Sequence, residues 1–196
     1  MEGRFNSEVF TMTEELIQYT DMSERDFIKW NLDYTMEQTI EIFKVIPTDH
    51  LCIRPRPNIN APGWIFGHII TAERAMIGGF AQGVMDIPGK YVVFSGLWSI
   101  PTESQLRDVL EPKDDLISYW HEVRKQTNEY LDQLTDADLK KIPEASILSD
   151  NDPLRNKPIR EYFVMTIEHQ NYHRGQLQAI SALIESDSQF SNKGTS

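Results

Sequence analysis

The sequence has little cysteine and lacks long apolar runs. Cys52 is the single cysteine in 196 residues, which excludes an intramolecular disulfide framework and fits a reducing compartment. The opening residues, MEGRFNSEVF, contain no apolar run as long as that of a signal peptide. No later segment reaches the roughly 18 consecutive apolar residues of a membrane span. We therefore expect a cytoplasmic protein that does not enter a membrane.

Basic residues are also scarce. The chain has 19 Lys and Arg against 30 Asp and Glu, and the resulting net charge of −11 repels phosphate backbones. The densest basic stretches, residues 54–56 and 155–157, are too short to form a basic patch. We therefore expect no nucleic-acid partner.

The sequence lacks the alternation of apolar and polar residues that is typical of β-strands, and its apolar residues recur at helical spacing instead. In residues 24–46 apolar or weakly polar residues recur in alternating steps of four and three, Ser23 is a suitable N-cap, and Pro47 ends the run. Similar reasoning predicts helices at about residues 62–83, 103–110, 112–134 and 158–184, with a shorter one near residues 11–20. Residues 84–101 read as a long loop with a brief extended piece at 91–94, and the polar tail at 186–196 is expected to be disordered. Together these features predict one all-α domain over residues 1–196. We expect a four-helix bundle with long crossover connections and a core at about residues 24–184.

The stretch HQNYHRGQL, residues 169–177, places His169 and His173 on one face of the last long helix. The inner face is expected to carry these two histidines with other residues at the same spacing: Tyr162, Thr166, Gln176, Ile180 and Leu183. Two histidines four positions apart also occur in the metalloprotease motif H-E-x-x-H, but Gln170 stands where the general base would be. The spacing therefore indicates either a metal site without protease chemistry or two core histidines with hydrogen-bond partners.

A zinc-like ion needs at least three protein ligands, and His68 supplies a third imidazole from the second helix. That helix, PGWIFGHIITAE, is apolar enough to be largely buried. Three histidines from two facing helices would leave further coordination positions open to water or substrate. An open site of this kind favours chemistry over a purely structural ion.

Two motifs give the chain a resemblance to the DinB-like (DinB/YfiT) superfamily of metal-binding four-helix bundles, over about residues 24–184. One is W-x-x-G-H followed by glutamate, and the other is H-x-x-x-H-R-G-Q; together they comprise Trp64, Gly67, His68, Glu73, His169, His173, Arg174, Gly175 and Gln176. The resemblance implies that the three histidines bind a divalent ion such as zinc or nickel and that the protein forms a homodimer. In some branches it implies transfer of a low-molecular-weight thiol, such as bacillithiol or mycothiol, to a small electrophile. An open imidazole site also accepts iron or manganese.

Four further residues are candidates for the surroundings of the site. Glu73 lies roughly 140° around the helix from His68, so we expect it to support the site or to pair with Arg174 rather than to bind the ion. Gln176 is placed to hydrogen-bond an imidazole or a bound water, with ordinary core packing as the alternative. Tyr34 is a candidate pocket wall with Trp30 and Tyr162, although aromatic residues at helical spacing more often belong to the core.

Two other residues have simpler interpretations. Cys52 lies in a proline-rich loop where nothing in the sequence favours a reactive thiolate, and His121 neighbours the inner-facing Trp120 and is expected at the surface.

The preferred function is a metal-dependent thiol S-transferase. The alternatives are a metal-dependent hydrolase or isomerase of a small molecule, and a non-catalytic stress-associated metal-binding protein.

Overall fold

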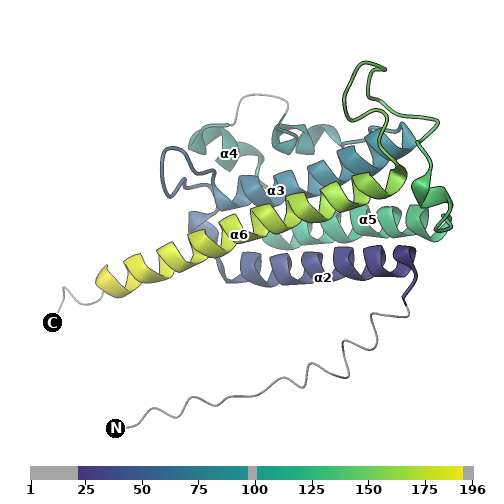
Figure 1. The fold of residues 1–196 in the computed structure, drawn as a ribbon. Coiled ribbons are helices and arrows are strands. Elements are labelled where there is room, and N and C mark those ends of the chain that lie inside the picture. Colours follow the sequence, from purple (N-terminus) through teal and green to yellow (C-terminus); the bar gives the residue numbers. More distant parts are fainter. Residues whose placement is uncertain (1–21, 97–100, 192–196) are drawn as a thin grey trace, which may run out of the picture.

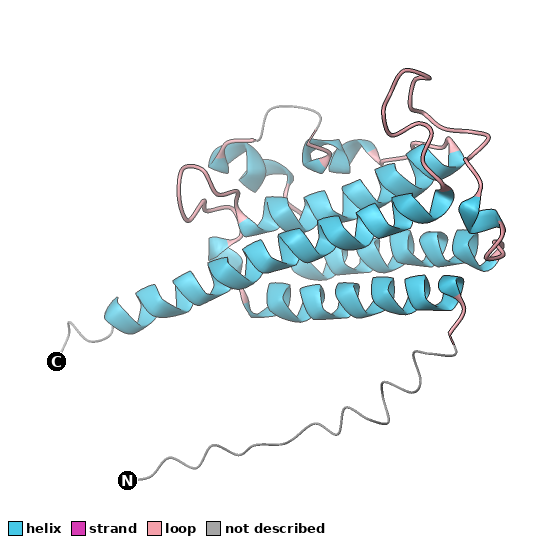
Figure 2. Cartoon of the chain, viewed as in Figure 1, coloured by secondary structure: helices cyan, strands magenta, loops and turns pink. Residues whose placement is uncertain are grey.

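The computed structural model describes residues 22–96 and 101–191, and every regular element in these ranges is a helix (Figure 2). This confirms the expected all-α class. The long elements are α2 (Glu24–Val45), α3 (Pro62–Glu73) with its π-helical continuation η2 (Arg74–Ala81), α5 (Lys113–Asp132) and α6 (Ile159–Ser191). The short elements are η1 (Thr48–His50), η3 (Gly89–Phe94), α4 (Glu103–Val109) and η4 (Asp138–Lys140). The expected helix near residues 11–20 lies outside the described residues.

Local sequence accounts for the helix ends. The Ser23 hydroxyl accepts a hydrogen bond from the Asp26 amide at 3.1 Å, which caps α2. Thr102 and Gln105 form a reciprocal capping box at the start of α4. Pro62 occupies the first turn of α3, where a missing amide hydrogen costs nothing.

Three sequence expectations were wrong in detail. Residues 91–94 belong to the 3-10 helix η3 rather than to an extended piece, because the Tyr91 amide bonds back to the Pro88 carbonyl. The helix α6 runs to Ser191, beyond the expected end at Ile184, since neither proline nor glycine interrupts that stretch. Leu183 is 37% exposed rather than on the inner face of α6, where Phe163, Gln170 and Leu177 are buried instead.

The long helices pack around α6. Contacts join α6 to α2, α3 and η2, while α5 packs against α2 and α3, and Figure 1 shows α6 running alongside α3 and projecting past the others toward the C-terminus. A fully buried aromatic cluster fills the space between α2, α3 and α5. Phe66 stacks on Phe43 with ring centroids 3.8 Å apart and meets Trp120 edge-on at 5.3 Å.

A buried polar network links all four long helices. The Arg124 guanidinium on α5 donates two hydrogen bonds of 2.9 Å to the carboxylate of Glu73 on α3. Trp120 and the Gln170 side-chain amide on α6 donate to the same carboxylate at 2.8 and 2.7 Å, and Arg124 also lies 3.5 Å from Asp33 on α2. Burial would raise the pKa of the Glu73 carboxyl, but the Arg124 charge and the hydrogen bonds that the carboxylate accepts together outweigh burial and hold that pKa below its usual value. Glu73 therefore stays ionised in the core.

Removing one partner of this buried ion pair should destabilise the protein strongly. Arg124→Ala leaves the Glu73 carboxylate buried without its cation, so we expect the free energy of unfolding in urea to fall by about 3–5 kcal/mol. Arg107→Ala is the matched control, because its ion pair with Glu103 lies on the surface of α4 and its loss should leave stability unchanged within error. Equal losses for the two variants would contradict a stabilising role for the network.

Candidate metal centre

The fold brings His68, His169 and His173 together between α3 and α6. The Nε2 atom of His169 lies 3.2 Å from that of His68 and 3.1 Å from that of His173. The ligand atoms of the three side chains all lie within 4.8 Å of one another. His68 comes from the regular part of α3, and the other two come from successive turns of α6.

On His68 and His173, hydrogen bonds made by Nδ1 fix which ring nitrogen carries the proton. The Phe94 carbonyl only accepts, so His68 must donate to it from Nδ1, at 2.8 Å. His173 Nδ1 lies 2.8 Å from the Gln176 side-chain oxygen, and the nitrogen of that amide donates to the Tyr172 hydroxyl. Both neutral rings therefore turn the lone pair of Nε2 toward the centre of the cluster.

Burial keeps the imidazoles uncharged. It lowers the pKa of His169 to about 3, with a smaller effect from the neighbouring histidines, and the pKa of His173 to about 4. Burial also lowers the pKa of His68, against the opposing effect of its bond to Phe94. Trp64 stacks on the His68 ring with centroids 4.7 Å apart and shields it from water. Neutral imidazole is the form that binds metal ions.

Two of the three separations between the ring nitrogens fit a single divalent ion. Nitrogens bound to one ion at about 2.0–2.1 Å lie about 3.0 Å apart on an octahedral face and about 3.4 Å apart in a tetrahedron. The two Nε2 separations of 3.1 and 3.2 Å fall between these limits. The three histidines can therefore hold a metal ion, and three ligands leave coordination positions for other molecules.

A cavity of 390 Å³ adjoins this cluster. His68 and His169 form part of its wall, and η2 contributes Ala75, Met76 and Phe80. A π-helix is uncommon and is often found at functional sites, because its extra residue per turn displaces the side chains that follow. The cluster therefore borders space that a small molecule can occupy.

Of the other predicted site residues, one contacts a histidine and others lie elsewhere in the fold. Gln176 accepts the hydrogen bond from His173, whereas Glu73 pairs with Arg124 rather than with Arg174. Tyr34 does not line the cavity, since it lies outside the buried face of α2 and stacks on Trp30 with 45% of its surface exposed. The Trp30 expectation is wrong for the same reason. Tyr162 is buried in the core, where its hydroxyl donates to the Leu154 carbonyl.

Sequence reasoning missed Arg124 and Gln170. A signal existed for Arg124, which falls four residues after Trp120 and three before Thr127 on the buried stripe of α5. A charged residue on such a stripe indicates a buried partner. Gln170, which follows His169 directly on α6, hydrogen-bonds both members of the ion pair.

The buried histidines should make the metal-free protein less stable in acid. The pKa values of about 3 for His169 and about 4 for His173 lie below the ordinary value of 6.5, so the unfolded chain binds more protons between these limits. The free energy of unfolding should therefore fall as the pH falls from about 6.5 toward 4, measured by urea unfolding. A His169→Gln, His173→Gln double variant should lose less stability over the same range; identical slopes would contradict this origin.

Comparison with known proteins agrees with the histidine motifs. The family model described as the DinB superfamily matches residues 31–177, which is three quarters of the chain. A search of curated proteins found no match. The matched region contains all three histidines, the Glu73–Arg124 ion pair and Gln170. Because the match covers most of the described helices, the chain belongs to the DinB superfamily.

Proposed function

We propose that this protein is a metal-dependent enzyme that transfers a low-molecular-weight thiol to a small electrophile. The observation that carries the proposal is the convergence of three neutral imidazoles on one point beside a cavity. The superfamily resemblance supports the remaining features. These are a four-helix bundle with crossover connections, a homodimer, and zinc or nickel as the ion; the proposed cytoplasmic location rests instead on the single cysteine.

The residues of this chain have separate roles in the proposed reaction. His68, His169 and His173 would hold the ion, while the Phe94 carbonyl and Gln176 keep two of the rings in the metal-binding tautomer. A bound divalent ion supplies Lewis acidity, which lowers the pKa of a coordinated thiol or water. In the transfer, the thiol sulfur forms a bond to carbon, the leaving group departs with its electron pair, and the thiol proton passes to solvent.

Two observations favour transfer over the alternatives. The cavity beside the histidines is mostly apolar and offers few groups to position a water for hydrolysis. The Glu73–Arg124 network joins the helices without the histidines, so a purely structural ion would add little to it. Metal-dependent hydrolysis or isomerisation of a small molecule is therefore the second candidate, and a non-catalytic metal-binding protein is the third.

Metal content tests the site itself. Protein purified without a metal-affinity step should contain about one divalent ion per chain by elemental analysis, and His169→Ala should lose it because two imidazoles bind far more weakly than three. His121→Ala is the matched control, since His121 is exposed on α5 and should leave the metal content unchanged. Absence of metal from the wild type after zinc or nickel is added would overturn the proposal.

The reaction needs a separate assay. The loaded protein is incubated with cysteine as the thiol and 1-chloro-2,4-dinitrobenzene as the electrophile, and both thiol consumption and chloride release are followed. We expect consumption that depends on the ion and is lost in His169→Ala. Metal-dependent chloride release without thiol would favour the hydrolase, and no reaction with any thiol and electrophile pair would remove the transferase.

A further inference from the structure

The cavity beside the histidines differs in chemistry from the other large cavities of the described part. The described residues of its wall are apolar apart from Ser95 and the two histidines, and none of them carries a charged side chain. By contrast, the cavity between η3 and α5 is lined by Arg74, Lys90, Glu111 and other charged residues. A charged group that entered the histidine cavity would lose its hydration without gaining a partner of opposite charge.

The outer wall of this cavity is fixed to η2 by the backbone. Ile147 and Leu148, in the loop between η4 and α6, form part of the cavity wall. The Ile147 amide donates to the Gly79 carbonyl at 3.0 Å. A Cβ atom on Gly79 would lie 2.8 Å from Cδ1 of Ile147 and 3.3 Å from the sulfur of Met85, so both cavity residues pack closely against this glycine.

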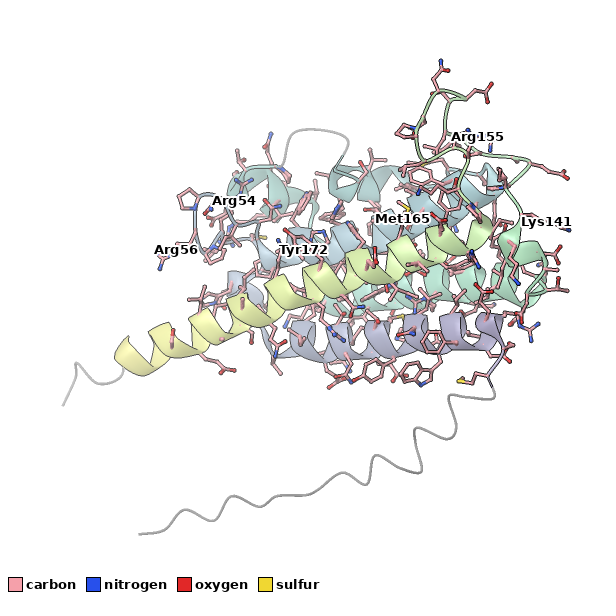
Figure 3. The ribbon with its side chains drawn as sticks, viewed as in Figure 1. Arg54, Arg56, Lys141, Arg155, Met165 and Tyr172 are labelled. Carbon is pink, nitrogen blue, oxygen red and sulfur yellow. The ribbon has the colours of Figure 1, made fainter. Side chains whose placement is uncertain are left out.

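The loop is also held from its other end. The Arg155 guanidinium donates to the carbonyls of Pro143 and Glu144 at 3.0 and 3.3 Å, which closes the loop on itself. Figure 3 shows Arg155 in this loop, which rises from the end of the molecule where α6 begins. Hydrogen bonds therefore fix Ile147 in the cavity wall, although the loop that carries it has no regular structure.

We propose that this cavity binds the uncharged, apolar part of the substrate, and that Met85 and Ile147 limit its size. The identity of that substrate rests on the proposed function, whereas the binding itself does not. Methionine side chains are flexible and polarizable, so Met76 and Met85 can fit around apolar groups of different shapes. With His68 and His169 in the same wall, an apolar group held here would place its reactive end beside the ion. The electrophile is accordingly a neutral aromatic or aliphatic compound rather than an anionic metabolite.

A matched pair of probes tests the proposal by isothermal titration calorimetry. 4-Phenylbutan-1-ol and 4-phenylbutanoate share one skeleton and differ in charge, and each is titrated into metal-free and metal-loaded protein. We expect the alcohol to bind both forms and the carboxylate to bind metal-free protein at least about 10-fold more weakly. Similar affinities of the two probes for metal-free protein would overturn the proposal.

Variants inside and outside the cavity test where the alcohol binds. Ala75→Leu enlarges a side chain of the cavity wall without replacing a histidine and should weaken alcohol binding at least about 10-fold. Ala179→Leu is the matched control, because Ala179 is exposed on α6 and the added methyl groups should leave binding unchanged. Ile147→Ala should enlarge the cavity and shift the preference toward 6-phenylhexan-1-ol. Alcohol binding that Ala75→Leu does not change would place the probe elsewhere and overturn the inference.

The failure of this inference is distinguishable from failure of the proposed function. Metal uptake together with no Ala75-dependent binding would overturn the cavity assignment alone. Alcohol binding by a protein that takes up no metal would overturn the proposed function and support the cavity assignment.

Discussion

The ion pair between Glu73 and Arg124 is the interaction on which the rest of the structure depends. Burying two charges costs several kcal/mol each, and the cost is recovered only when the geometry is good and the remaining polar atoms are satisfied. Here both carboxylate oxygens accept from the guanidinium, and Trp120 and Gln170 supply the other donors. Because these groups come from three helices, the pair fixes the rotation and height of α6 relative to α3. The histidines meet only when that register is correct.

A second constraint acts within the site. The Nε2 lone pairs of His68 and His173 both face Nε2 of His169, and the fold holds these two rings in that orientation through bonds to Nδ1. One of the bonds that does this comes from the Phe94 carbonyl in η3, outside the long helices. Part of the α3–α5 connection is therefore a component of the site. The same carbonyl accepts from Thr71, which keeps the segment close to α3.

The sequence predicted the periodic parts of this protein and the histidines, and it failed where tertiary contacts decide. Helix ends at Ser23, Pro47 and Pro62 follow from capping and proline chemistry, and His169 and His173 share a face because of their spacing. Gln170 was missed because a network that joins several helices has no local signature, and Arg124 was missed although its place on the buried stripe of α5 indicated a buried partner. The prediction that Tyr34 lines the pocket was wrong because the sequence alone does not show against which elements an aromatic side chain packs.

The change from α3 to η2 at Arg74 divides one continuous helix into two parts, of which the first carries a histidine and the buried glutamate and the second adds residues to the cavity wall. His68 and Glu73 lie on the regular side, and Ala75, Met76 and Phe80 lie on the wider side. Removing one residue after Arg74 would rotate the η2 part of the cavity wall by roughly a quarter of a turn and leave His68 and the ion pair where they are. A single-residue insertion or deletion would therefore give the same histidine cluster a different set of neighbours. In this architecture the histidine cluster and the cavity residues of η2 can be inherited separately.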